Sequence, residues 1–422
     1  MNCIFLTIGN KEEIKNIYLI LESIYIYGKL NSTTDILIYT NTEIMELIKE
    51  SHLYNSNIKF EINDEDLKVF NSLEIFKLSS ISAYSKLIYL CNNIIVNGDI
   101  NKLFNLITAD KIYVLEEGEI NTISLFENEL DNYEDKSSFS TNIILFNNSD
   151  KIKKLFNDNY EDKSSFIYNA IKNNLFDNKI LKDYISLSSI PEITATYEVL
   201  YYQNIEISYE LLKNKLIQIK EILINDNILK TKKYIDSNLI PIINNSREIL
   251  EPSIFTLQHT AYDDTYINKA KNICNIVLNS NIKNIIEVGF NAGFSTLLML
   301  LTNPDVKITC IDIGLHSYTS KCYDRMKEDF GDRINLIIGD SIEILPTIND
   351  KYDLIHIDGG TSHDLLINDT IHAYRLAHKG TMIMMNNINM HMLWHKFKTS
   401  LKLKNLNINI YASYYSHEIY YV

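Results

Sequence analysis

The chain has 422 residues, of which 46% are hydrophobic and 22% are charged, so it can build the cores of two or three domains. Its formal net charge of −14 argues against a nucleic-acid partner, because a phosphate backbone attracts basic surfaces. Five cysteines without paired spacing indicate a reducing compartment, the cytoplasm, and no zinc site, and the lack of an apolar stretch of about 18 residues argues against a membrane span.

Residues 1–175 are predicted to form an α/β unit. Apolar runs at 3–8 and 35–39 indicate strands, and the pattern between them, at 15–27, has the periodicity of a helix. Strands that alternate with helices are typical of a sheet with parallel neighbours.

A motif in residues 84–104 narrows the fold of this unit. An aromatic residue and a lysine come before an apolar strand, and an apolar triplet, an Asp turn and a Leu-Phe pair follow it: Tyr84, Lys86, Tyr89-Leu90, Ile94-Ile95-Val96, Gly98-Asp99 and Leu103-Phe104. The stretch resembles the retaining nucleotide-sugar glycosyltransferases that include glycogenin. This resemblance implies a GT-A-like fold for residues 1–175 and a sugar or nucleotide-sugar as ligand.

The resemblance fails where that family carries its chemistry. Cys91 and Asn93 replace the D-x-D pair that holds a divalent cation, and a thiol is a poor ligand for Mg²⁺ or Mn²⁺. The later F-N-x-G and D-Q positions carry Ser140, Asn142 and Ser164-Ser165. We therefore expect a domain that kept the fold and lost sugar transfer. A metal-independent transferase is the alternative.

Residues 176–256 are predicted to be a helical linker. From Ser208 to Leu229, apolar residues recur at helical spacing with Lys and Glu between them, which indicates one long amphipathic helix. The stretch from Asn244 to Pro252 is the predicted boundary into a last domain, residues 257–422.

The last domain opens with a strand, a tight turn and a helix. The apolar run 285–288 includes Glu287 and leads into two glycines four residues apart, Gly289 and Gly293. Glycines allow the backbone to approach a ligand closely, and the helical run that follows, 297–301, offers free N–H groups at the start of its helix.

Three further strands are each followed by polar residues. Strand 306–312 ends in Asp312, strand 335–338 leads into Asp340-Ser341, and strand 352–357 leads into Asp358. Their alternation with helical runs predicts a doubly wound parallel sheet that binds its ligand at the carboxyl ends of the strands. An acid at the end of the second strand can accept both hydroxyls of a ribose.

Together these motifs, E-x-G-x-x-x-G-x-S, D, G-D-S and D-x-I-x-I-D-G-G, resemble the class I S-adenosylmethionine-dependent methyltransferases. The closer likeness is to sugar and small-molecule O-methyltransferases related to catechol O-methyltransferase. The resemblance implies S-adenosylmethionine as cofactor, held by Glu287, Gly289, Asn291, Gly293, Ser295, Asp312, Asp340 and Ser341. A Rossmann-like domain that binds NAD, or no nucleotide, is the alternative, although dinucleotide sites have the spacing G-x-G-x-x-G.

The catalytic residues predicted from this resemblance are Asp358 and His363. Asp358 matches the first metal ligand of the catechol O-methyltransferase relatives, and Asn386 and Asn387, after the fifth strand, match the others. Mg²⁺ or another divalent cation would be bound weakly by one carboxylate and two amides, so the amides could instead bind the substrate. His363 is a candidate general base. Asp369 matches another family Asp, but a solvated helix carboxylate explains it equally well.

The chain is expected to end in an antiparallel hairpin made of strands 408–411 and 419–422. The sequence as a whole predicts an S-adenosylmethionine-dependent O-methyltransferase that acts on a sugar or glycan. The alternatives are a bifunctional glycosyltransferase and methyltransferase, and a carbohydrate-binding protein without activity. Neither the acceptor nor the oligomeric state follows from the sequence.

Overall fold

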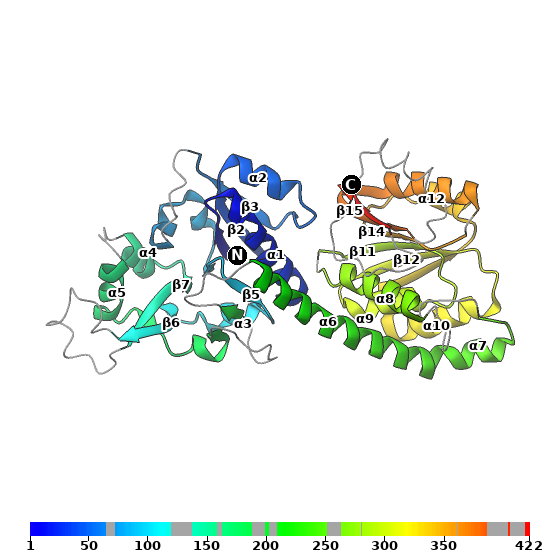
Figure 1. The fold of residues 1–422 in the computed structure, drawn as a ribbon, viewed down its shortest axis with the longest axis horizontal. Helices are drawn as coiled ribbons and strands as arrows, with labels where there is room; N and C mark the ends of the chain where they lie inside the picture. Colours follow the sequence, from blue (N-terminus) through cyan, green and yellow to red (C-terminus); the bar gives the residue numbers. More distant parts are fainter. Residues whose placement is uncertain are drawn as a thin grey trace. The chain divides into compact units, whose positions relative to one another are not determined.

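A computed structural model of the chain divides into two compact α/β units, residues 1–219 and 220–422 (Figure 1). The structure describes residues 1–64, 72–119, 137–157, 163–187, 199–201, 209–250, 263–279, 281–360, 362–385, 404–405 and 418–422. Within these ranges, no helix combines the length and the apolar character needed to cross a membrane.

The first unit is built on a mixed seven-stranded sheet with the order β3-β2-β1-β4-β7-β6-β8. The strands from β3 to β4 are parallel, and β7 runs antiparallel to both β4 and β6. Every residue of β2 is buried, as expected for a parallel strand covered on both faces. The strands are β1 (Asn2–Thr7), β2 (Thr34–Thr40), β3 (Ile58–Ile62), β4 (Lys86–Leu90), β6 (Ile112–Glu119), β7 (Ser137–Asn147) and β8 (Phe176–Asp177).

Helices and a second, smaller sheet complete this unit. The small sheet has the order β5-β10-β9 and consists of β5 (Ile94–Val96), β10 (Val199–Tyr201) and β9 (Ile185–Leu187). Aromatic rings fill the core, and the ring centroid of Phe156 lies 5.2 Å from that of Phe146 and 5.0 Å from that of Phe166. The helices are α1 (Ile14–Tyr27), α2 (Thr42–Lys49), α3 (Asn101–Leu106), α4 (Asp150–Asn157) and α5 (Lys163–Lys172), with 3-10 turns η1 (Lys11–Glu13), η2 (Ser72–Lys77), η3 (Ser79–Ala83) and η5 (Leu181–Asp183).

A long helix carries the chain from the first unit into the second. It comprises α6 (Tyr209–Tyr234), a π-helical turn η6 (Ile235–Leu239) and α7 (Ile240–Ser246). Pro241 cannot donate a main-chain hydrogen bond to the preceding turn, and the π-helical turn lies immediately before it. The helix thus begins where the sequence predicted and runs well past Leu229. The predicted helical region 176–256 also contains β8, β9 and β10, which belong to the sheets of the first unit.

The second unit is a doubly wound sheet with the order β13-β12-β11-β14-β15-β17-β16, whose first five strands are parallel. Strand β17 runs antiparallel to β15, as predicted for 419–422, whereas 408–411 lie outside the described residues. The strands are β11 (Asn284–Val288), β12 (Lys307–Asp312), β13 (Ile334–Ile338), β14 (Tyr352–Ile357), β15 (Ala377–Met385), β16 (Lys404–Asn405) and β17 (Glu418–Tyr421). The helices are α8 (Asp263–Val277), α9 (Phe294–Thr302), α10 (Ser317–Phe330), α11 (Ser341–Ile344) and α12 (His363–Leu376), with 3-10 turns η7 (Gly331–Arg333) and η8 (Leu345–Thr347).

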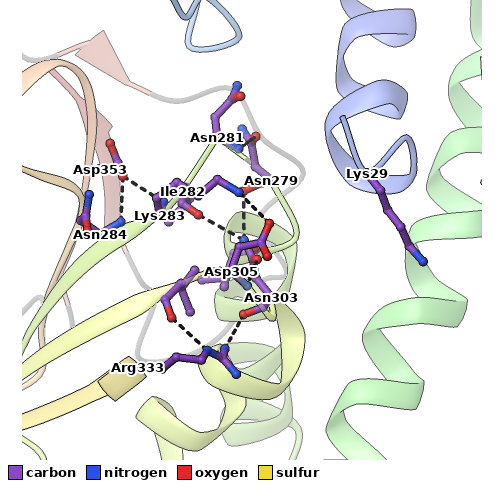
Figure 2. Close-up of polar contacts among 12 residues, drawn as sticks. Lys29, Asn279, Asn281, Ile282, Lys283, Asn284, Asn303, Asp305, Arg333 and Asp353 are labelled. Carbon is purple, nitrogen blue, oxygen red and sulfur yellow. Dashed lines mark hydrogen bonds and ion pairs between the residues drawn. The ribbon is translucent and has the colours of Figure 1, made fainter. Parts of the chain in front are cut away.

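Side chains close the amino ends of these parallel strands (Figure 2). The Oδ2 atom of Asp353 accepts hydrogen bonds from the main-chain N–H groups of Lys283 and Asn284, at 2.9 and 2.8 Å. The Nδ2 atom of Asn303 donates to main-chain carbonyls of the segment 277–282. Asp353 and Asn303 thus hold the amino ends of the strands in place, whereas sheets of this kind bind their ligands at the carboxyl ends.

Candidate cofactor site

The turn after β11 passes so close to β14 that only glycine fits at its first position. Gly289 has φ +97°, and a Cβ atom there would lie 2.5 Å from the carbonyl oxygen of Asp358. Gly293, with φ +78°, starts α9 from the same turn. L-residues adopt such dihedrals only at a cost, so both glycines predicted for the cofactor site are required by the backbone itself.

Asp312, at the end of β12, fixes this turn. Its Oδ2 atom accepts hydrogen bonds from the N–H groups of Phe290 and Asn291, at 2.9 and 2.7 Å, and its Oδ1 atom accepts one from Gly314 at 2.7 Å. A carboxylate offers about four lone-pair sites. Three donors therefore leave room for a ligand hydroxyl on this half-exposed side chain, which stays the predicted ribose contact.

Glu287 is enclosed by the protein rather than open to the turn. It is fully buried, and its carboxylate accepts hydrogen bonds from Ser295 Oγ at 2.5 Å, from the hydroxyl of Thr296 and from His356 Nδ1 at 2.9 Å. Its predicted contact with a cofactor stays a prediction. In the structure the hydrogen bond between Ser295 and Glu287 joins β11 to the first turn of α9. Both residues therefore stabilise the turn from the protein interior.

His356 is a site residue that sequence reasoning missed. It lies in β14 directly opposite Glu287 and is fully buried. Burial alone lowers the pKa of His356, but the hydrogen bond and the negative charge of Glu287 outweigh it, so the pKa is raised above its usual value. His356 Nδ1 and the Glu287 carboxylate therefore form a buried polar pair between β11 and β14. A polar residue inside an otherwise apolar strand was the only signal in the sequence.

Apolar side chains surround the ends of β12 and β13. Ile313, Leu315 and Ile338 are 56%, 78% and 48% exposed, which is unusual for large aliphatic residues that follow or end buried strands. Gly314 and Ile338 are in contact, because a Cβ atom at Gly314 would lie 2.9 Å from Ile338 Cγ2. The loops after the two strands thus form one apolar surface beside Asp312.

Asp340 and Ser341 border this surface. Asp340 caps α11, accepting a hydrogen bond from the N–H group of Ile342 at 2.9 Å. The side chain of Ser341 hydrogen-bonds to Asp369 on α12. Asp369 is only 1% exposed, so the reading of it as a solvated carboxylate is wrong, and burial raises its pKa.

These elements lie in the segment that matches a known family. Residues 286–388 match the family of methyltransferase domains. The second unit contains a methyltransferase domain. The resemblance predicted from the strand-end motifs is therefore confirmed for this part of the chain. No curated protein matches the chain.

Solved structures similar to the chain fall into two groups, at low identity. One group includes the O-methyltransferase TomG from Streptomyces achromogenes, solved with SAM (14% identical, 44% of this chain and 88% of that chain, TM-score 0.32), and a putative O-methyltransferase from Klebsiella pneumoniae (15%, 44% and 89%, 0.30). The other includes the galactosyltransferase LgtC (10%, 52% and 96%, 0.37). These similarities concern the fold alone.

The second unit also contains a buried lysine, Lys269, that the sequence did not reveal. It lies on α8 and is 5% exposed. Burial lowers the pKa of Lys269, and the negative charge of Asp358 counteracts this. Asp358 is half-exposed after β14, and its N–H group donates to the carbonyl of Val288 at 2.9 Å. Asp358 therefore lies next to the glycine turn and influences the ionisation of Lys269.

The remaining predicted catalytic and metal-binding residues are only partly described. His363 is the first residue of α12, at the carboxyl end of β14, and its side chain lies outside the description, as do Asn386 and Asn387. No group of three His, Cys, Asp or Glu side chains in the described ranges could hold a metal. Asp358, a single carboxylate that interacts with a lysine, is a poor donor set for a hard divalent cation.

In the first unit, the described residues after β4 include Cys91 and Asn93, a thiol and an amide, at the two positions where the resemblance predicted metal-binding carboxylates. Burial raises the pKa of Cys91, which follows β4, to about 11, so the side chain is a neutral thiol. The carboxylate of Glu13 accepts hydrogen bonds from Asn10 Nδ2 at 2.8 Å and from Asn92 Nδ2 at 3.4 Å. This places a negative charge between the ends of β1 and β4.

Proposed function

We propose that the methyltransferase domain transfers a methyl group from S-adenosylmethionine to a hydroxyl of a sugar or glycan, and that the first unit binds saccharide without transferring it. The observation that carries the proposal is the glycine turn fixed by Asp312 inside a segment that matches the methyltransferase family. The five free cysteines suit a reducing cytoplasm.

The described residues fit the cofactor part by part. The free lone pair of Asp312 accepts a ribose hydroxyl. The exposed aliphatic side chains of Ile313 and Ile338 cover the faces of a purine, with Asp340 at its edge. The first turn of α9 offers N–H groups to a carboxylate.

The acceptor side of the site is assigned to Asp358, Lys269 and His363. The cofactor, when bound, supplies a sulfonium methyl group for in-line displacement by an oxygen. His363 takes the proton of the acceptor hydroxyl as general base. Asp358 orients that hydroxyl, and the ammonium group of Lys269 stabilises the negative charge that develops on the oxygen, a task that a divalent cation performs in the relatives of catechol O-methyltransferase.

The sugar specificity rests on the first unit. Its strand ends combine a neutral thiol with the carboxylate of Glu13, which repels a nucleotide diphosphate instead of neutralising it. Such a surface suits an uncharged saccharide and not a transfer reaction. If the purified protein hydrolysed or transferred UDP-sugars with Mn²⁺, the bifunctional alternative would replace this part of the proposal.

Calorimetry with S-adenosylmethionine and S-adenosylhomocysteine tests the cofactor assignment. We expect wild-type protein to bind both, and Asp312→Ala to weaken binding at least about 30-fold, because the variant loses a ribose contact and frees two N–H groups of the turn. Glu343→Gln, on the nearby α11, is the matched control and should bind normally. A wild-type protein that binds neither compound would end the proposal.

The acceptor is found by incubating the protein with labelled methyl donor and a panel of free sugars, nucleotide-sugars and glycans. With a good acceptor, His363→Ala should lower kcat with little change in cofactor affinity, as expected for a base that acts on the acceptor only. Chelators should leave the rate unchanged if Lys269, and not a metal, supplies the positive charge. Label on protein side chains instead of sugars would redirect the search.

A further inference from the structure

The segment that follows the long helix is bound to the start of α10. Arg247 ends α7 with φ +61°, and the next residue, Glu248, turns its carboxylate onto α10. Its Oε1 atom accepts a hydrogen bond from the N–H group of Ser317 at 3.0 Å, and its Oε2 atom lies 3.0 Å from His316 Nδ1. These bonds hold the pKa of Glu248 below its usual value, and the positive end of the helix favours the anion.

Two aromatic rings continue from this carboxylate into the domain. The ring of His316 stacks on that of Tyr318, with centroids 4.8 Å apart and planes at 6°. Tyr318 is fully buried, and its hydroxyl donates a hydrogen bond of 2.6 Å to Oδ1 of Asn291. A buried tyrosine hydroxyl of this kind is fixed by its partner and by the packing of its ring.

In the glycine turn, Asn291 is a residue other than glycine that has a strained backbone. Its φ is +51°, in the left-handed region, which costs of order 1 kcal/mol for a residue other than glycine. Two groups hold it there: Asp312 accepts from its main-chain N–H at 2.7 Å, and Tyr318 donates to its side chain. Neither the main chain nor the side chain of Asn291 can relax without breaking a bond.

We propose that Tyr318 is a positioning residue for cofactor binding, and that Glu248 and His316 hold it in place. The four residues Glu248, His316, Tyr318 and Asn291 form one chain of contacts from the end of the long helix to the turn that receives the cofactor. The affinity for S-adenosylmethionine then depends on a segment that does not touch it. This inference rests on the proposed function, because it names a control of the same site.

The chain of contacts explains why the turn carries asparagine where glycine would be free of strain. Glycine at this position would adopt the same φ but would have no side chain for Tyr318 to hold. The strained asparagine makes the conformation of the turn conditional on α10 and, through Glu248, on the segment after α7. Displacement of that segment would release Tyr318 and lower the affinity for the cofactor.

A double-mutant cycle between Tyr318 and Asn291 tests the inner link. Tyr318→Phe keeps the ring and removes the hydroxyl, and we expect it to weaken binding of S-adenosylhomocysteine about five- to tenfold in calorimetry. In an Asn291→Ala background the same substitution should have no further effect, because its partner is gone. Effects that simply multiply would show that the two residues act independently and would overturn the proposal.

The outer link is tested with Glu248→Ala and with a control on α10, the helix to which Glu248 is bound. We expect Glu248→Ala to weaken cofactor binding about threefold or more, and to add nothing once Tyr318 is Phe. Glu328→Gln, which alters an exposed ion pair with Arg325 on α10, should bind as wild type does. If Glu248→Ala lowers only the melting temperature and leaves the affinity unchanged, the carboxylate is structural and the proposal is wrong.

Hydrogen exchange separates this inference from the proposed function. In the protein without cofactor, Tyr318→Phe should accelerate amide exchange in residues 290–293 and leave β11 protected. Unchanged exchange in the turn counts against the inference, whatever the affinity data show. Conversely, if the wild-type protein binds no S-adenosylmethionine, the proposed function is wrong. The exchange result still decides whether Tyr318 holds the turn.

Discussion

The parallel strands of the methyltransferase domain have similar polar residues at both of their ends, here called the amino edge and the carboxyl edge of the sheet. The two edges differ in the backbone that these residues hold. At the amino edge, Asp353 accepts hydrogen bonds from main-chain N–H groups and Asn303 donates to main-chain carbonyls. There Lys283 also pairs with Asp305, at 2.7 Å (Figure 2). At the carboxyl edge, Asp312 also accepts from main-chain N–H groups, but the groups belong to a turn with left-handed backbone.

Three features distinguish the carboxyl edge, where we propose that the cofactor binds, from the amino edge. The carboxyl edge has strained dihedrals, exposed aliphatic side chains such as Ile313 and Leu315, and a buried carboxylate, Asp369, whose Oδ2 atom has no hydrogen-bond partner in the described part of the chain. Each costs folding free energy. The two edges therefore differ in backbone strain and in the burial of charge, and not in the types of residue that they carry.

The largest expected effect comes from removing the closest backbone approach at the carboxyl edge. Gly289→Ala should lower the affinity for S-adenosylmethionine by about 100-fold or more, because its Cβ atom would lie 2.5 Å from the carbonyl oxygen of Asp358 and the turn must move. Calorimetry measures the affinity. Gly331→Ala is the control: it has φ +56° and open space around it, so it should reduce stability slightly and leave binding intact.

A variant of the amino edge should do the reverse. Asp353→Ala removes the acceptor of two main-chain N–H groups and of His378 Nε2, and we expect it to reduce the free energy of unfolding by about 2 kcal/mol with unchanged cofactor affinity. Asp305→Ala, which breaks an exposed ion pair with Lys283, should cost under about 1 kcal/mol. If Asp353→Ala and Asp305→Ala reduced the free energy of unfolding equally, the hydrogen bonds of Asp353 would not be what stabilises the amino edge.

The pH dependence of this loss provides a second measurement. Burial opposes the ionisation of Asp353, but His378 and the two N–H groups outweigh it and lower its pKa below the usual 3.8. A lowered pKa contributes stability that is present above pH 3.8 and disappears as the pH falls through the folded value. Denaturant titrations should therefore show the gap between wild type and Asp353→Ala closing in strong acid, and a gap that is constant with pH would contradict the assignment.

The sequence predicted the elements of this domain better than its interior. The strand at 285–288, the glycine turn and the acid at 312 were all visible, because periodicity and glycine spacing are local properties. The burial of Glu287 was not visible in the sequence, because it depends on the strand register that places His356 opposite Glu287. Lys269 was missed for the same reason: which face of α8 is buried follows from packing between elements.

The N-terminal unit shows the same limit at another scale. Strands β1 and β2 were predicted within one or two residues, since their apolar runs are continuous. The hydrogen bond from Asn92 to Glu13 joins positions 79 residues apart, so the local sequence around either residue could not predict it. Likewise, the short strands β9 and β10 escaped notice because three residues are too few to show alternation.

The smallest expected effect is a gain in stability at the carboxyl edge. Asp369→Asn removes a carboxylate that is 1% exposed, and we expect the variant to be about 1 kcal/mol more stable than wild type at neutral pH. Burial raises the pKa of Asp369, so the folded wild type holds its proton more tightly than the unfolded chain and loses stability as the pH rises from 3.8 through the folded value. The advantage of the variant should accordingly vanish below about pH 4 in melting experiments.

The matched control for this gain lies on the same helix. Asp364, exposed in the first turn of α12, is favoured by the helix N-terminus, so Asp364→Asn should lower stability by about 0.5 kcal/mol. A stabilised Asp369→Asn that also binds S-adenosylmethionine more weakly would mean that the buried carboxylate is retained for the site and not for the fold, since Ser341, its hydrogen-bond partner, borders the apolar surface beside Asp312. If Asp369→Asn were instead less stable at every pH, the hydrogen bonds to the carboxylate would outweigh the cost of its burial, and the contrast between the two edges would lose its clearest member.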